Sequence, residues 1–186
     1  MKKVLKEIMP YIIILIVVVL IRSYIITPVT VVGSSMYPNL KDKEVLLLSK
    51  ISYRLHNIER FDIVVVKDDE DDRIIKRIIG LPGDKVEYKD NLLYINDELI
   101  KEDYANGDTD DFTLEDICIT TSIRNGTYSD DFKCSYDKIP EDYYLVLGDN
   151  RKISKDSRII GLIPKDEIKG KTVFRIWPLK KFGTIE

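Results

Sequence analysis

Short apolar runs rich in β-branched residues recur along this chain beyond its N-terminal segment, and they constrain its fold more than any other feature. Polar turns separate the runs, as they separate the strands of a β domain. The runs lie at residues 29–32, 45–48, 63–66, 74–79, 85–88, 92–95, 143–147 and 172–176. Between two of them, Lys89-Asp90-Asn91 predicts a hairpin, because Asp and Asn tolerate left-handed backbone conformations. The sequence therefore predicts a mainly β fold.

The N-terminal segment is apolar in a different way. Residues 9–26 read MPYIIILIVVVLIRSYII, and their unbroken apolar part ends at residue 21. A helix needs about 20 apolar residues to cross the roughly 30 Å hydrocarbon core of a bilayer. The segment reaches that length when Arg22 extends its guanidinium to the interface. We therefore expect an N-terminal transmembrane helix in contact with membrane lipid.

The charges that flank this segment predict its orientation. Lys2, Lys3 and Lys6 precede it, and the positive-inside rule keeps such residues in the cytoplasm. A removable signal peptide is the alternative, but residues 23–28 contain no small-x-small cleavage pattern. Residues 1–27 are thus predicted to form a cytoplasmic tail and a single-pass anchor in the cell membrane, with everything after Thr27 outside the cytoplasm.

Composition limits what the rest of the chain can be. With 186 residues, 44% hydrophobic and 33% charged, the chain fits one modest domain plus an anchor. The net charge of −3 leaves no basic surplus to displace counterions from phosphates, which argues against nucleic acid as a partner. Residues 101–142 are rich in Asp, Glu, Ser, Thr and Asn. We interpret them as a small acidic subdomain inserted into a β core of residues 28–100 and 143–186.

The acidic insert and the cysteines leave alternatives open. The insert lacks the carboxylate order of an EF-hand loop, which disfavours calcium binding. The chain's two cysteines, Cys118 and Cys134, lie in the predicted extracytoplasmic part, where a disulfide is chemically allowed. Their spacing has no metal-ligand character, and the single histidine, His56, stands near no serine motif. A Ser-His-Asp triad would depend on His56, which reads better as a solvated loop residue.

A serine and a lysine offer the alternative chemistry. A serine hydroxyl needs a base to become a nucleophile, and a lysine serves only when its amine is neutral near working pH. Burial among aliphatic side chains lowers a lysine pKa in this way. Lys76 lies in Ile74-Ile75-Lys76-Arg77-Ile78-Ile79, where strand periodicity places Ile74 and Ile78 on its own face. A lysine that reaches solvent from an edge strand is the alternative reading.

Four sequence blocks, found in a fixed order, are the most specific motifs of the chain. They are GSSMYP at 33–38, RFDIV at 60–64, KRIIGLPGD at 76–84 and GDNRKISKDSR at 148–158. Together with the anchor, the chain resembles the type I signal peptidases over most of its length outside the acidic insert. The resemblance implies a signal-peptidase-like β domain and a membrane-bound serine endopeptidase that removes signal peptides from exported preproteins. It implies no metal or organic cofactor.

The same resemblance implies roles for single residues. Ser35 is the expected nucleophile and its backbone N–H part of the oxyanion hole, with Lys76 as general base. Ser154 matches the serine that hydrogen-bonds the catalytic lysine. Asp156, Arg77 and Arg158 match a supporting charge network, whose other reading is structural ion pairs that hold a turn.

Departures from the family pattern concern turn geometry and not the reacting groups. Gly33 stands where the family can supply a second oxyanion donor, Ser34 where Asp or Gly is common, Asn39 where Thr is common and Phe61 where Gly is common. Two other functions remain as alternatives. A self-cleaving repressor would carry DNA-binding helices in place of the anchor, and a non-catalytic tethered binding module would lack the serine or the lysine.

Overall fold

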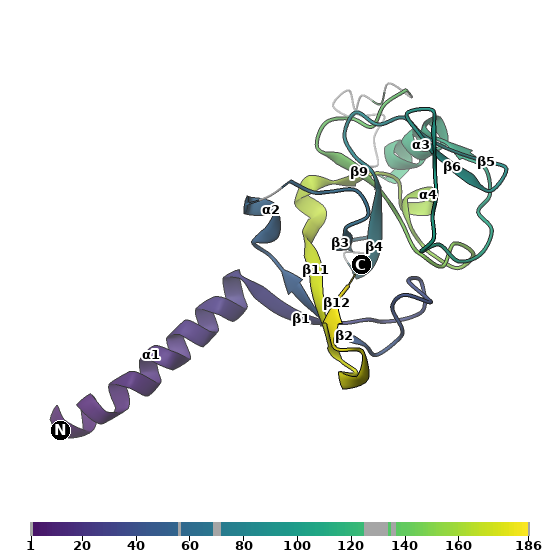
Figure 1. Cartoon of the computed structure of the whole chain (residues 1–186). Helices are drawn as coiled ribbons and strands as arrows, with labels where there is room; N and C mark the ends of the chain where they lie inside the picture. The colour runs from purple at the N-terminus through teal and green to yellow at the C-terminus, as the bar shows by residue number, and fades with distance from the viewer. Residues whose placement is uncertain (1, 56, 69–71, 125–133, 135–136, 186) are drawn as a thin grey trace.

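The computed structural model describes residues 2–55, 57–68, 72–124, 134 and 137–185. Two antiparallel sheets make up most of a mainly β domain, and a long N-terminal helix projects away from it (Figure 1). The mainly β prediction is confirmed.

The first sheet holds the central strands of the domain. Its strands run in the order β1-β2-β11-β3-β4-β9-β10, and β12 pairs with β11. In β3, Val64, Val65 and Val66 are at most 2% exposed. A strand covered on both faces is continuously apolar in sequence, which is why this run shows no polar alternation. The bounds are β1 Ile26–Thr30, β2 Val45–Ser49, β3 Ile63–Lys67, β4 Arg73–Gly80, β9 Tyr143–Leu147, β10 Ile163–Pro164, β11 Ile168–Trp177 and β12 Gly183–Thr184.

The second sheet is built from tight hairpins. It runs in the order β7-β6-β5-β8, with β5 Val86–Lys89, β6 Leu92–Ile95, β7 Glu98–Ile100 and β8 Phe112–Thr113. Asp90 and Asn91, between β5 and β6, have φ of 52° and 63°. These left-handed values suit a two-residue turn, so the hairpin predicted at this position is confirmed.

The predicted acidic insert contains a helix that its composition did not predict. Helix α3 spans Leu114–Arg124 and begins with a capping box. Thr113 N donates to Asp116 Oδ2 at 2.8 Å, and Asp116 N donates back to Thr113 Oγ1 at 3.4 Å. Ile117 of α3 is 1% exposed and joins the core between the sheets. Part of the predicted solvated insert is therefore packed structure.

One apolar cluster joins the two sheets. Ile79 and Leu145 contribute from the first sheet, Val86 and Leu93 from the second, and Ile117 from α3. β8, which belongs to the predicted insert, pairs with β5, which belongs to the predicted core. The two sheets therefore share one interior. The disulfide left open by the sequence joins Cys118 to Cys134.

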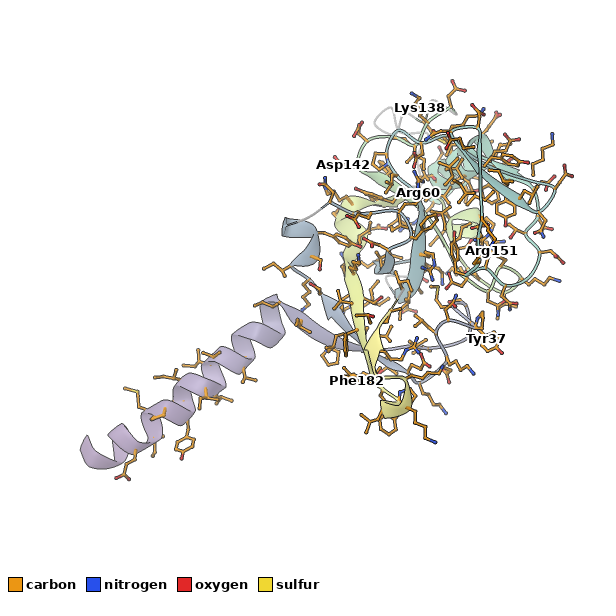
Figure 2. The ribbon with its side chains drawn as sticks, viewed as in Figure 1. Tyr37, Arg60, Lys138, Asp142, Arg151 and Phe182 are labelled. Carbon is orange, nitrogen blue, oxygen red and sulfur yellow. A yellow bond between two sulfur atoms is a disulfide. The ribbon has the colours of Figure 1, made fainter. Side chains whose placement is uncertain are left out.

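The N-terminal helix α1 spans Lys2–Tyr24 and stands clear of the β domain (Figures 1 and 2). Its described apolar side chains are exposed, with Ile13 at 54% and Leu15 at 63%. Across the described residues, no helix combines the length and apolarity required to cross a membrane. The structure thus does not show the transmembrane helix that the sequence predicted.

Short helical segments complete the chain. They are α2 Ser52–Leu55, α4 Ser157–Ile160, η1 Lys165–Glu167 and η2 Leu179–Lys181. The predicted strand at 29–32 differs from β1, which starts earlier and ends at Thr30. Beyond Thr30, Val31 N still donates to Glu44 O and Val31 O accepts from Lys43 N, whereas Val32 is 86% exposed and Gly33 has φ of 81°.

Candidate active site

Ser35 lies in the loop between β1 and β2, and its neighbours anchor that loop. Met36 is 1% exposed and Leu40 is fully buried, both in a cluster with Ile75 of β4. Leu40 N donates to Met36 O at 2.8 Å, which closes one turn after the serine. The apolar anchors fix the loop against β4 and leave Ser35 half-buried beside it.

Lys76 lies in β4 and is 2% exposed. It is directly opposite Val64 of β3, and residues opposite one another on paired strands share a face. Val64, Ile74 and Ile78 belong to one apolar cluster. The aliphatic surroundings that strand periodicity predicts for this lysine are therefore present.

The structure brings the lysine and the serine together. Lys76 Nζ lies 2.9 Å from Ser35 Oγ and 3.1 Å from Ile75 O. Burial lowers the pKa of Lys76 from 10.5 to about 8, although the carboxylates of Asp156 and Asp149 act in the opposite direction. Desolvation therefore outweighs the attraction of these carboxylates for the charged amine.

Lys76 is placed to remove a proton from Ser35. A neutral amine has a lone pair, and at hydrogen-bond distance it can accept the proton of the Ser35 hydroxyl. With a pKa of about 8, about a tenth of the Lys76 amines are neutral at pH 7. The pair has the geometry of an activated nucleophile and its base.

The turn after β9 contacts the backbone of the nucleophile loop. Asn150 N donates to Ser35 O at 2.9 Å, and Asn150 Nδ2 donates to Ser34 O at 3.2 Å. Gly148 approaches so closely that a Cβ there would lie 2.6 Å from Ser35 O. Only glycine fits this approach without displacing a neighbour, so the turn and the loop are packed backbone against backbone.

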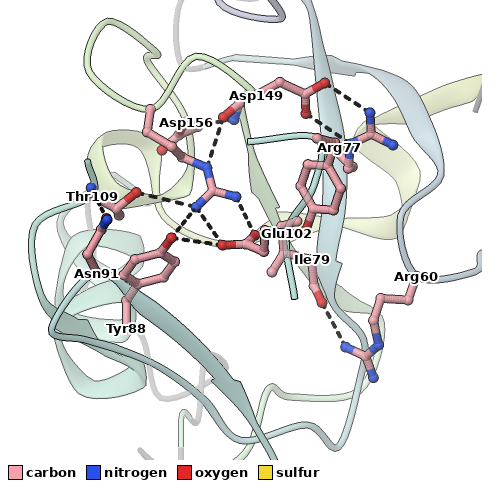
Figure 3. A network of polar contacts seen from close by, with 12 residues as sticks. Arg60, Arg77, Ile79, Tyr88, Asn91, Glu102, Thr109, Asp149 and Asp156 are labelled. Atoms are coloured by element: carbon pink, nitrogen blue, oxygen red, sulfur yellow. Dashed lines mark hydrogen bonds and ion pairs between the residues drawn. The ribbon is translucent and has the colours of Figure 1, made fainter. Parts of the chain in front are cut away.

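Asp149 connects that turn to β4. It is fully buried and accepts two hydrogen bonds from Arg77, each of 2.9 Å. Arg77 also donates to Phe61 O at 3.0 Å, and its guanidinium lies 4.4 Å from the ring centroid of Tyr104. Figure 3 shows Arg77 and Asp149 facing one another across this contact. Because Arg77 follows Lys76 directly, the pair holds the strand that carries the lysine.

Asp156 and Arg158 form a second pair. Arg158 Nε donates to Asp156 Oδ1 at 2.8 Å, and Asp156 Oδ2 accepts from Gly148 N at 3.0 Å. Asp156 is also the N-cap of α4. The predicted charge network thus consists of two separate ion pairs, and both hold the turn at residues 148–151.

Ser154 does not make the contact that the sequence predicted for it. Its Oγ is buried and forms no hydrogen bond within the described part of the chain. The side chain packs against Gly148, where a Cβ would lie 2.1 Å from Ser154 Oγ. Packing against Gly148 thus takes the place of the predicted hydrogen bond to Lys76, and the role of Ser154 stays a prediction.

A buried ion pair that sequence reasoning missed lies behind the same turn. Arg151 is 2% exposed and forms an ion pair with Glu102. Its Nη1 also donates to Tyr88 Oη at 3.0 Å and to Thr109 Oγ1 at 3.3 Å. Figure 3 shows Tyr88, Glu102 and Thr109 close together. Asp149 and Arg151 both stand in the block at 148–158, but their partners come from distant segments. The block was the only sequence signal for them.

Two further sequence predictions concern the surroundings of the serine. Gly33 N, at the position of a second oxyanion donor in the family, donates to Asp42 Oδ1 at 2.9 Å. His56 lies outside the described residues. Within the described ranges, no three His, Cys, Asp or Glu side chains are grouped to hold a metal ion.

The family model and the curated relatives that match this chain agree with one another. The model of the signal peptidase family, peptidase S26, matches residues 3–177. Signal peptidase IB of Staphylococcus aureus (strain COL) is 37% identical over 190 residues, which cover 97% of this chain and 93% of that protein. Signal peptidase I of Bacillus caldolyticus is 35% identical over 183 residues, 94% of this chain and 92% of that protein. A crystal structure of a signal peptidase I from Enterococcus faecalis V583 has 35% identity and a TM-score of 0.48, covering 62% of this chain and 97% of that one.

The family match and the two relatives define the class of protein, a serine peptidase. More particularly, this chain belongs to the signal peptidase family, peptidase S26.

Proposed function

We propose that this chain is a membrane-bound serine endopeptidase that removes N-terminal signal peptides from exported preproteins with a Ser35–Lys76 dyad. The observation that carries the proposal is the 2.9 Å contact between Lys76 Nζ and Ser35 Oγ, made by a lysine whose pKa burial lowers to about 8. The names of the relatives from S. aureus and B. caldolyticus support the substrate class.

In the proposed reaction, Ser35 Oγ attacks the carbonyl carbon of the scissile peptide while its proton passes to Lys76 Nζ. The backbone N–H of Ser35 donates to the developing oxyanion. Collapse of the tetrahedral intermediate breaks the C–N bond, and the protonated Lys76 returns the proton to the leaving amine. The neutral Lys76 then activates a water molecule, which hydrolyses the acyl-enzyme and releases the signal peptide.

The supporting residues are proposed to act through position. Arg77 pairs with Asp149 and so holds β4, which carries Lys76. Asp156 pairs with Arg158 and holds the turn that contacts the Ser35 loop. Ser154 borders the same turn; its buried Oγ forms no hydrogen bond among the described residues, and it is proposed to turn to the neutral amine and aim it. Substrates carry small residues one and three positions before the cut, as signal peptides do.

The membrane location belongs to the same proposal. The large apolar residues of α1 from Ile8 to Val19 are at least 40% exposed. An exposed apolar helix is covered best by lipid, and Lys2, Lys3 and Lys6 favour a cytoplasmic N-terminus. The β domain then lies on the extracytoplasmic side, where the anchor raises the effective concentration of Ser35 near a membrane-embedded signal sequence.

Cleavage of a preprotein with an Ala-x-Ala site by the full chain in detergent tests the dyad. We expect a cut after the second alanine, and we expect Ser35→Ala and Lys76→Ala to be folded and inactive. Ser122→Ala on α3 and Lys89→Ala on β5 are matched controls remote from the site, and both should cleave normally. Cleavage by either dyad variant at the normal rate would refute the assignment.

Fractionation tests the membrane location separately. We expect the full chain to stay with membranes during an alkaline carbonate wash and a variant lacking residues 1–25 to be released. Protease added from outside should digest the β domain in intact spheroplasts. Release of the full chain by the wash would contradict the proposed anchor and leave the dyad untouched.

A further inference from the structure

Asn39 occupies a junction between the nucleophile loop, the lysine strand and the second sheet. We propose that Asn39 is a positioning residue that fixes the separation of Ser35 from Lys76 by linking the Ser35 loop to the Arg77–Asp149 ion pair. This inference rests on the function proposed above, since it concerns how the same dyad is held.

Three hydrogen bonds fix Asn39 in place. Its Nδ2 donates to Asp149 Oδ2 at 2.7 Å and to Tyr104 O at 2.8 Å. Its backbone carbonyl accepts from Arg175 Nη2 of β11 at 2.8 Å. Both hydrogens of the side-chain amide and the backbone carbonyl therefore have partners. Each partner comes from a segment far from Asn39 in sequence. A residue held from three sides can transmit the position of these segments to its own loop.

The contacts close a ring around the dyad. From Ser35 the chain leads to Asn39, then through hydrogen bonds to Asp149 and to Arg77, which is next to Lys76. The ring is completed by the 2.9 Å contact between Lys76 Nζ and Ser35 Oγ. Loss of the Asn39 link removes one of two connections on the serine side, since Asn150 N, next to Asp149, still donates to Ser35 O, and it leaves the lysine in its buried position.

Tyr104 strengthens the junction from the predicted insert. Its carbonyl accepts from Asn39, while its ring lies 4.4 Å from the Arg77 guanidinium. Tyr104 thus contacts both Asn39 of the Ser35 loop and Arg77 of β4. This gives the segment that starts at residue 101 a structural connection to the dyad.

An amide side chain satisfies both acceptors at this junction. Asp149 is a buried carboxylate, and the Asn39 amide supplies one N–H donor to it and one to Tyr104 O. Threonine has one donor and satisfies one acceptor. Aspartate has none and would place a second carboxylate against Asp149. The expected order of function is therefore Asn, then Thr, then Asp.

The chain offers a matched control at a second junction of the same kind. Asn96 Nδ2 donates at 2.9 Å to Asp84 Oδ1, and Asp84 is paired with Arg60 as Asp149 is paired with Arg77. Asn96→Asp therefore creates the same carboxylate–carboxylate contact as Asn39→Asp, but at the edge of the second sheet. Asn96 is exposed whereas Asn39 is half-buried, so Asn96→Asp is expected to lower the melting temperature less than Asn39→Asp.

The test compares the full chain with Asn39→Asp, Asn39→Thr and Asn96→Asp in detergent. Cleavage of a peptide with a small-x-small site gives kcat and KM, and a melting curve gives stability. We expect Asn39→Asp to lower kcat by about 10- to 100-fold with KM changed less than about twofold, because misplaced reacting groups cost rate more than binding. Asn39→Thr should lie between, and Asn96→Asp should keep its kcat within about twofold.

The outcomes separate the two proposals. If the wild type cleaves and both Asn39 variants keep its kcat well below their melting temperatures, the positioning role is refuted while the dyad stands. An equal loss of kcat in Asn96→Asp would also refute it, since the effect would then be general destabilisation. An inactive wild type would refute the proposed function itself. Should Asn39→Asp fail to fold, the kcat of Asn39→Thr decides.

Discussion

Replacing Lys76 by Met should make the protein more stable at pH 7 while it abolishes cleavage. Met has a similar length and no charge, so it removes the cost of burying an amine that is 2% exposed. The folded state lowers the pKa of Lys76 from 10.5 to about 8, so below pH 8 the fold must bury a charged amine. Lysine at this position is therefore expected to reduce stability.

The magnitude follows from the two pKa values. A tenfold change in proton affinity is worth about 1.4 kcal/mol, so the fall from 10.5 to about 8 corresponds to about 3 kcal/mol. Met also loses the hydrogen bonds to Ser35 Oγ and Ile75 O, at about 0.5–1.5 kcal/mol each. The net gain at pH 7 is therefore at most about 2 kcal/mol. At about 2–4 °C per kcal/mol, the melting temperature should rise by up to about 8 °C.

The lowered pKa of Lys76 also sets the direction in which stability changes with pH. Between pH 8 and 10.5 the unfolded lysine keeps its proton while the folded one has lost it, so stability rises with pH in this window. The cost of burial is complete below pH 8 and absent above 10.5. The advantage of the Met variant should therefore shrink by about 2 kcal/mol between pH 7 and 10.

Thermal and urea unfolding of the full chain in detergent, followed by circular dichroism from pH 7 to 10, measure this difference. Ser35→Ala is the control, because it keeps the lysine and should show the pH dependence of the wild type. A Met variant that is less stable than the wild type at pH 7, or whose advantage does not change with pH, would refute the reasoning.

Two further substitutions probe the surroundings of the dyad. Asp68→Asn removes a carboxylate that raises the pKa of Lys76, so the pH of half-maximal kcat/KM should move lower; an unmoved profile would show that Asp68 does not act on the lysine. Gly148→Ala adds a Cβ that would lie 2.1 Å from Ser154 Oγ and 2.6 Å from Ser35 O. We expect it to cost about 1–3 kcal/mol of unfolding free energy and to lower kcat at least about tenfold. Peptide cleavage by this variant at the wild-type rate would contradict the close packing described.

The parts of the fold that were predictable are those with a strong local signal. β3 and β4 are apolar runs with β-branched residues, and the hairpin at Asp90-Asn91 has residues that accept positive φ. The strands β8, β10 and β12 have two residues each, too few to show a period.

Helix α3 was missed for a related reason. Its sequence LEDICITTSIR contains several β-branched residues, which have low helix propensity. Packing of Leu114 and Ile117 into the core outweighs that weakness. The capping pair of Thr113 and Asp116 was the one local signal, and the acidic composition of the segment concealed it.

The site also has features that the sequence predicts and features that only the tertiary fold creates. The aliphatic surroundings of Lys76 follow from strand alternation, whereas its approach to Ser35 depends on how the loop after β1 folds onto β4. The partners Asn39, Asp149 and Tyr104 come from three separate segments. No spacing in the sequence encodes such a contact, because it arises only when the tertiary fold brings the loops together.

The pH dependence of preprotein cleavage tests the central claim most directly, namely that Lys76 acts as a neutral base on Ser35. With a pKa of about 8 for Lys76, kcat/KM should rise about tenfold between pH 7 and 9 and level off above that, and Ser35→Ala should be inactive throughout. A rate that keeps rising towards pH 10.5 would show a lysine with an ordinary pKa, and a rate independent of pH, or cleavage by Ser35→Ala, would show that another group performs the reaction.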